Sequence, residues 1–124
     1  MNTRAPRTLA VLASLVLAGC EAANPQAPLK YAKKLDSATS GISTDCGLAY
    51  QVAAFPGDHR TDLDTLELMA LRSVRKLAYV WRHNPNWYYQ GETVSQIVGA
   101  SLSMLDSCGL HRARTELRRA TARR

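Results

Sequence analysis

The sequence has 124 residues, of which 46% are hydrophobic and 21% are charged, and its formal net charge is +6. This length predicts one domain at most, and the hydrophobic fraction is typical of a globular protein and excludes a wholly disordered chain. The excess positive charge lies at the C-terminus, because residues 111–124 contain six arginines against Glu116, whereas residues 20–110 are close to neutral.

The first 19 residues have the organisation of an export signal. Arg4 and Arg7 form a positive n-region, and residues 9–18 form an apolar run. This run is shorter than the roughly 20 apolar residues that a transmembrane helix needs. We therefore expect residues 1–19 to be a signal peptide that is removed from the mature protein.

The tetrapeptide Leu17-Ala18-Gly19-Cys20 follows the apolar run. It resembles the lipobox of bacterial lipoproteins, and the resemblance covers residues 1–20 only. It implies cleavage before Cys20 and attachment of a diacylglyceryl group to the Cys20 thiol, and two or more acyl chains anchor a protein stably. In Gram-negative lipoproteins, Asp after this cysteine commonly retains the protein at the inner membrane, and Glu21 does not match that pattern. The resemblance therefore implies the outer membrane in a Gram-negative cell, or the outer leaflet of the cell membrane in a Gram-positive cell.

Residues 20–28 are small, polar and proline-containing, and they are expected to form a tether between the lipid and the domain. A first helix is predicted from Pro28, because apolar residues recur from there at steps of three and four. Gly41 is expected to break or kink this helix. The predicted apolar face consists of Tyr31, Leu35, Ala38, Ile42, Cys46, Ala49 and Ala53.

The second helix has the clearest pattern. Thr61 is expected to cap it, Asp62 and Asp64 lie in its first turn, and Asn84-Pro85-Asn86 ends it. Its predicted apolar face consists of Leu63, Leu66, Ala70, Val74, Leu77 and Trp81.

A third helix is predicted from about Glu92 to Ser107, with Gly109 as its C-cap. The sequence shows no strand pattern. Residues 29–110 are therefore expected to form an all-α, antiparallel three-helix bundle. The buried side of the third helix consists of Val94, Ile97, Val98, Leu102 and Leu105.

The Arg-rich tail, residues 111–124, leaves two structures open, a short fourth helix or a frayed end. Its charge favours a solvated or disordered segment. The functional alternative is attraction to anionic phospholipid or cell-wall polymer. Nucleic acid is not an expected partner, since the export signal removes the protein from that compartment.

The cysteines predict one disulfide. If Cys20 carries lipid, Cys46 and Cys108 remain as a pair in an oxidising compartment. A bundle can bring them within the Cα–Cα range that a disulfide requires. A buried pair of free thiols and a redox site are the alternatives, but no CxxC motif supports redox chemistry.

Catalytic motifs are missing from the sequence. His59, His83 and His111 are scattered without metal-ligand spacing, and there is no GxSxG, phosphate loop or GxGxxG. Asp58 and His59 lie near Asp62 and Asp64, but the start of a helix explains this cluster. We therefore expect no catalytic residue, no metal site and no cofactor.

The best candidate for a binding surface is an aromatic cluster, Tyr79, Trp81, Trp87, Tyr88 and Tyr89. Aromatic faces stack on sugar rings or on a partner protein, and Arg82 and His83 would add polar contacts. The alternative is that these rings close the end of the bundle. Trp81 lies on the core face, whereas Trp87, Tyr88 and Tyr89 leave both interpretations open.

We therefore expect a membrane-anchored envelope lipoprotein that acts as a non-enzymatic binding or accessory module, whose partner is an envelope protein or a cell-wall polymer. The alternative is binding of cell-wall glycan or anionic polymer through Trp87, Tyr88, Tyr89 and the basic tail.

Overall fold

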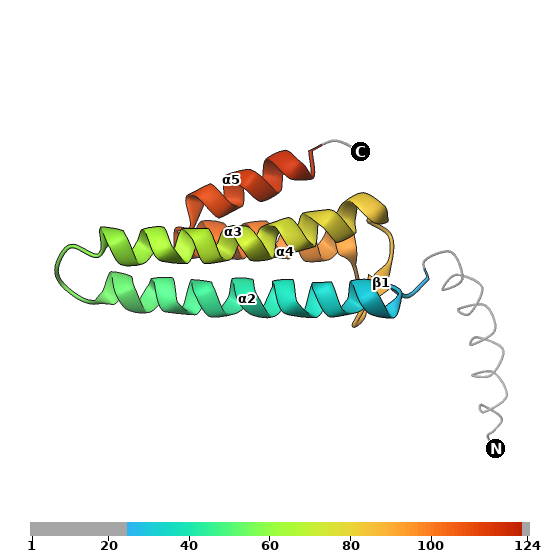
Figure 1. Cartoon of the computed structure of the whole chain (residues 1–124), viewed down its shortest axis with the longest axis horizontal. Coiled ribbons are helices and arrows are strands. Elements are labelled where there is room, and N and C mark those ends of the chain that lie inside the picture. The colour runs from blue at the N-terminus through green and yellow to red at the C-terminus, as the bar shows by residue number, and fades with distance from the viewer. Residues whose placement is uncertain (1–24, 123–124) are drawn as a thin grey trace, which may run out of the picture.

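The computed structural model describes residues 25–122, and it confirms the predicted all-α antiparallel bundle with its fourth, C-terminal helix and its disulfide. Four helices and a two-stranded hairpin follow one another along the chain (Figure 1). They are α2 (Leu29–Ala54), α3 (Arg60–His83), β1 (Tyr88–Tyr89), β2 (Glu92–Thr93), α4 (Val94–Cys108) and α5 (His111–Ala120).

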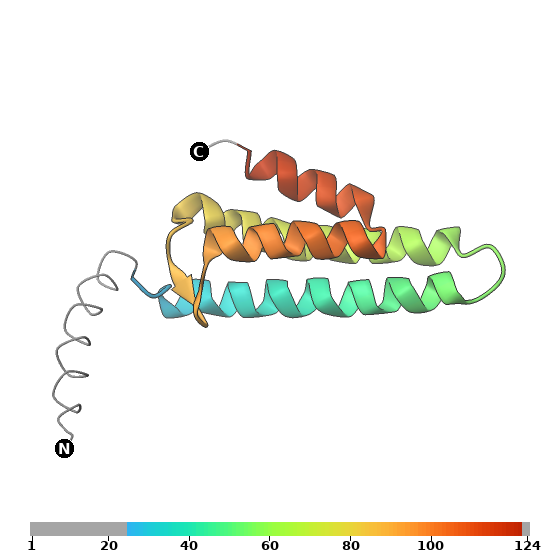
Figure 2. The same ribbon diagram turned by 180° about the vertical axis from the view of Figure 1, so that it is seen from behind.

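The helices alternate in direction. Long helices α2 and α3 form an antiparallel pair, α4 packs on both, and α5 lies over α3 and α4 on the side away from α2 (Figures 1 and 2). The α2–α3 pair extends beyond the end of α4 towards its connecting loop. At the opposite end, which we call the hairpin end, α2 begins, α3 ends, and β1 and β2 lie.

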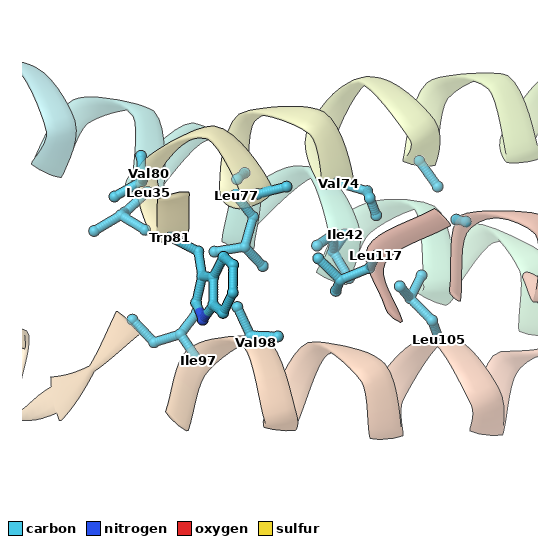
Figure 3. Packing of buried hydrophobic residues seen from close by; sticks show 14 of the residues in the cluster. Leu35, Ile42, Val74, Leu77, Val80, Trp81, Ile97, Val98, Leu105 and Leu117 are labelled. Atoms are coloured by element: carbon cyan, nitrogen blue, oxygen red, sulfur yellow. The ribbon is translucent and has the colours of Figure 1, made fainter. Parts of the chain in front are cut away.

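The core follows the predicted helical stripes. Leu35, Ile42, Val74, Leu77 and Leu105 are fully buried between α2, α3 and α4. Trp81 points from α3 towards Ile97 and Val98 of α4 (Figure 3), and it is 8% exposed, as its place on the α3 stripe predicts. Three residues of the predicted faces are not buried: Leu63 and Ala53 are exposed, and Leu102 is half-buried. Ala53 is near the end of α2 and Leu63 is near the start of α3, next to the loop that connects the two helices.

Two glycines bear on the predicted helices, Gly41 inside α2 and Gly109 at the end of α4. The predicted break at Gly41 is wrong, because α2 is continuous through it. Gly41 packs against Ser73 of α3, and a Cβ at this position would overlap Ser73 Oγ. Gly109 ends α4 in the left-handed region at φ 84°, as predicted.

The starts of two helices differ from prediction. Thr61 does not cap α3, which begins at Arg60, one residue earlier, and the Arg60 N–H donates to Asp58 Oδ1. Helix α4 begins at Val94 rather than Glu92, because Thr93 and Gln96 form a reciprocal capping box.

Of the two structures left open for the C-terminal tail, the protein has the short fourth helix, because residues 111–120 form α5. Ala113 and Leu117, four residues apart, are fully buried against the bundle. Its first turn is also held from α3: Glu67 is 8% exposed and accepts the N–H groups of Arg112 and Ala113, each at 3.1 Å. Two buried apolar side chains and this cap outweigh the repulsion between the arginines.

The hairpin end contains an unpredicted pair of short strands. The turn residues Gln90 and Gly91 have positive φ angles of 52° and 84°, as a tight hairpin turn requires. Tyr88 also pairs with the incoming chain, since Ala27 N–H donates to the Tyr88 carbonyl and Tyr88 N–H donates to the Pro25 carbonyl. The later part of the segment expected to be a tether is therefore attached to the domain.

Candidate functional site

The hairpin end carries a cluster of four aromatic rings drawn from three parts of the chain. Tyr31, near the start of α2, lies 4.8 Å from the His83 ring and 4.8 Å from the Trp87 ring, measured between centroids. Tyr79 lies 4.5 Å from His83 and 6.2 Å from Tyr31. We call Tyr31, Tyr79, His83 and Trp87 the ring cluster.

Two lysines of α2 cover this cluster. The Lys30 Nζ lies 5.0 Å from the Tyr31 centroid, and the Lys34 Nζ lies 5.3 Å from the Tyr79 centroid. Lysines at these distances are attracted to the ring faces. The surface is therefore both aromatic and cationic.

The three rings proposed from sequence as a binding surface are half-buried, so each is used partly by the fold. Trp87 contacts Tyr31, and Tyr88 pairs through its backbone with residues 25–27. The Tyr89 hydroxyl donates to Asp36 Oδ1 at 2.7 Å, and burial together with this carboxylate raises the pKa of Tyr89. Arg82 is exposed beside the cluster.

The predicted disulfide is present. Cys46 on α2 and Cys108 at the end of α4 are bonded, with their Cα atoms 5.4 Å apart. The bond joins α2 to α4 across 62 residues of sequence. The predicted lipidation site, Cys20, and the predicted signal peptide, residues 1–19, lie outside the described residues.

A second polar feature lies between α2 and α3. Asp45 is only 3% exposed, and burial raises the pKa of its carboxyl group. It lines a hollow of about 310 Å³ together with Arg72, Ser73 and Lys76. Lys76 Nζ donates to Ser37 Oγ across the same hollow at 2.9 Å. The sequence pattern missed Asp45, although it directly precedes Cys46 on the buried stripe.

A further hollow, about 450 Å³ and open to solvent, lies between α3 and α5. It is lined by Arg75, His111, Arg112, Glu116 and Arg119, among others. Two of its arginines have acidic partners, since Arg112 pairs with Asp64 at 3.5 Å and Arg119 pairs with Glu116. Only the Arg112–Asp64 pair joins α5 to α3, because Arg119 and Glu116 both belong to α5.

His59 and His83 each contact residues that are three or four positions away in the sequence. His59 contacts Asp62 at 3.5 Å and the Phe55 and Pro56 carbonyls, while His83 contacts the Tyr79 carbonyl. Among residues 25–122, no three His, Cys, Asp or Glu side chains are placed to hold a metal ion. None of the helices in this range is long and apolar enough to cross a membrane.

The α2–α3 loop end carries exposed apolar side chains, including Leu48, Tyr50 and Phe55. A hollow of about 260 Å³ lies between the two helices here, lined by Leu48, Val52, Asp62, Thr65 and Leu66.

Comparison with protein-family models, curated proteins and solved structures finds no match to this chain. The meaning of these surfaces therefore rests on their own chemistry. Sequence reasoning found Tyr79, His83 and Trp87 but did not connect Tyr31 with them, because Tyr31 lies about fifty residues away on another helix. The available signal was the antiparallel pairing of the first two helices, which places the start of α2 beside the end of α3.

Proposed function

We propose that this protein is an exported bacterial lipoprotein, anchored to a membrane of the cell envelope by lipid on Cys20, whose helical domain acts as a non-enzymatic binding or accessory module. The anchor would be the diacylglyceryl group that the lipobox-like sequence implies, and cleavage before Cys20 would make this residue the first of the mature chain. The domain, residues 25–122, would then stand at the membrane surface with its hairpin end next to the anchor.

The observation that carries this proposal is the Cys46–Cys108 disulfide. Disulfides persist in oxidising compartments, outside the cytosol, which supports export. The bond also accounts for two of the three cysteines in the sequence. The cysteine that remains, Cys20, is the one at the lipobox position.

The polar side chains that connect one element to another support a binding role rather than catalysis. Glu67 is occupied by the N–H groups of α5, and Asp36 accepts the Tyr89 hydroxyl. Arg114 of α5 pairs with Asp106 of α4 at 3.4 Å. These groups join one element to another, and each contributes to the shape of the domain.

Intact mass of the protein in the membrane fraction tests the anchor, with Cys20→Ala as the control. The proposal predicts a chain that begins at Cys20 and is heavier by a diacylglyceryl group or more, and the loss of this species in the variant. A mass without lipid, or cleavage at another bond, would overturn the proposal. Turnover of a cell-wall or lipid substrate that is abolished by one side-chain substitution would overturn its non-enzymatic part.

A second candidate function is binding of cell-wall glycan or anionic polymer through Trp87, Tyr88, Tyr89 and basic residues of α5. The observation in its favour is that the three rings are half-buried rather than buried. Pull-down on purified cell wall tests it, with Tyr88→Ala compared with the unchanged protein.

The basic residues are best tested without deleting α5, because Leu117 and Ala113 belong to the core. Substitution of the exposed Arg118 and Arg119 by Gln removes charge and leaves the buried face intact. Retention on cell wall that falls with either change supports this function, and no retention of the unchanged protein excludes it.

A further inference from the structure

The hairpin end has an exposed basic surface around the ring cluster. Residues 29–36 and 79–93 together contain four Lys or Arg side chains against two carboxylates. One of these carboxylates, Asp36, accepts the Tyr89 hydroxyl. Leu29 is 71% exposed and Tyr79 is 39% exposed beside the lysines. We call this surface the hairpin-end patch: Leu29, Lys30, Lys33, Lys34, Tyr79, Arg82, His83 and Trp87.

The path of the chain limits how far this patch can be from the anchor. Pro25 and Ala27 are hydrogen-bonded to Tyr88, so the chain is fixed to the hairpin end from Pro25 onward. Five residue steps separate Pro25 from Cys20, and a fully extended chain spans at most about 18 Å over that distance. If Cys20 is lipidated, the hairpin end is the part of the domain held next to the bilayer.

The chemistry of the patch matches the surface of a bilayer. Trp and Tyr rings prefer the level of the lipid headgroups, where one part of the ring is in an apolar and one part in a polar environment. Lysines near an anionic leaflet are attracted to it within roughly one Debye length, about 8 Å at physiological ionic strength. The patch offers both kinds of side chain on the end that the anchor holds closest.

We propose that the hairpin-end patch docks on the headgroup region of an anionic phospholipid bilayer, so that the domain is held at its membrane by this contact as well as by the lipid on Cys20. This inference rests on the proposed function, because the lipid supplies the proximity. Docking sets the orientation of the domain: α2 and α3 point away from the membrane, and the α2–α3 loop is presented at the far end.

The ring geometry favours a bilayer over a glycan. Stacking on a sugar requires an open ring face. Here Trp87 and His83 lie against Tyr31, and Lys30 and Lys34 lie over the Tyr31 and Tyr79 rings. Insertion between headgroups needs only exposed cations and part of a ring. Lys30 and Lys34 are exposed, as is Tyr79, and Trp87 is half-buried.

Trp87 provides the readout. The chain has two tryptophans, so Trp81→Phe leaves Trp87 as the single tryptophan, whose emission is measured with excitation that tyrosine does not absorb. The mature chain, residues 20–124, contains every residue that the structure describes, and it can be coupled through Cys20 to a maleimide lipid because Cys46 and Cys108 are bonded to each other. Quenching of Trp87 by lipids brominated near the headgroup is then measured in phosphatidylcholine vesicles with and without phosphatidylglycerol.

The proposal predicts quenching in the vesicles that contain phosphatidylglycerol, and weaker quenching in high salt and in phosphatidylcholine alone. Each lysine near an anionic surface contributes roughly fivefold to binding, so Lys30→Gln, Lys33→Gln and Lys34→Gln together should lower the ratio of docked to undocked domain on the order of a hundredfold. A matched control removes the same charge from the middle of α3, by Arg72→Gln, Arg75→Gln and Lys76→Gln, and should leave quenching nearly unchanged.

Two results would overturn docking: no quenching in anionic vesicles, or equal loss in both triple variants. A change in Trp87 emission on addition of cell-wall fragments, without quenching by lipid, would assign the patch to a glycan instead. If Trp81→Phe disturbs the fold, the quenching of Trp87 is obtained instead as the difference in tryptophan emission between the unchanged protein and Trp87→Phe. Because the coupling is chemical, failure of docking here is distinct from failure of lipidation in cells.

Discussion

The contact between Glu67 and α5 offers a sharp test of how the domain is stabilised. Glu67 lies on α3, is 8% exposed, and accepts the N–H groups of Arg112 and Ala113 at the start of α5. Helix α5 has no side-chain cap of its own, so these two donors depend on Glu67. The positive end of the α5 dipole also favours a carboxylate in this place.

We expect Glu67→Ala to destabilise the domain by about 2 kcal/mol, since loss of an N-cap costs roughly 0.5–2 kcal/mol and buried donors left unpaired place it at the upper end. For a domain of this size, that corresponds to a fall in Tm of roughly 10–15 °C. Glu67→Gln, which keeps one acceptor oxygen but loses the charge, should cost about 1 kcal/mol. Urea unfolding followed by circular dichroism measures all three proteins.

The matched control is Asp64→Asn, one turn before Glu67 on the same helix. Asp64 pairs with Arg112 of α5 at 3.5 Å, but its side chain is 65% exposed. An exposed ion pair contributes little, so this variant should lie within about 0.5 kcal/mol of the unchanged protein. If Glu67→Ala lowered the free energy of unfolding no more than Asp64→Asn does, Glu67 would not hold α5 on the bundle.

Three further predictions concern the rest of the bundle. Reduction of the Cys46–Cys108 bond, which closes 62 residues, should lower the free energy of unfolding by about 4 kcal/mol in denaturant titrations with and without reductant, and an unchanged midpoint would contradict this. Gly41→Ala should destabilise by about 1–3 kcal/mol because its Cβ overlaps Ser73 Oγ, and adding Ser73→Ala should restore most of the loss; no rescue would refute that contact. Burial raises the pKa of the Asp45 carboxyl group above its ordinary value of 3.8, so the native state binds the carboxyl proton more tightly than the unfolded state does. The stability that this group contributes is therefore present below pH 3.8 and is lost as the pH rises through the folded pKa. Asp45→Asn should therefore be more stable than the unchanged protein at pH 7 and equal to it at low pH, and the opposite order in urea titrations at the two pH values would contradict the sign.

Local patterns were sufficient for most of the fold. The stripe of Leu66, Ala70, Val74, Leu77 and Trp81 predicted the buried face of α3, because each side chain returns to the same side of the helix. The cysteine pair was predictable because helical bundles bring distant stripes together and because the lipobox-like sequence assigned the third cysteine, Cys20, to a proposed lipid.

The errors came from contacts between distant segments. Six arginines in residues 111–124 favoured a solvated tail, whereas Ala113 and Leu117 form a buried pair and Glu67 caps the helix from α3. No local pattern around Glu67 indicates this role, because its partner helix lies more than forty residues away. Leu63 shows the converse error, since its helical stripe continues past the point where other helices cover it.

The candidate site could be predicted only in part from the sequence, because it too depends on contacts between distant segments. The Asn84-Pro85-Asn86 turn and the following aromatic residues marked the hairpin end, but the position of Tyr31 among them depends on the pairing of α2 with α3. The attachment of residues 25–27 to Tyr88 is a backbone contact, and side-chain patterns carry no information about it.

The most direct test of the central claim is the state of all three cysteines in one sample. Protein taken from the membrane fraction, digested without reduction and analysed by mass spectrometry, reports the linkage of each cysteine. We expect one peptide pair joined through Cys46 and Cys108, and an N-terminal peptide that begins at Cys20 and carries lipid. A disulfide that includes Cys20, or a Cys20 peptide without lipid, would contradict it.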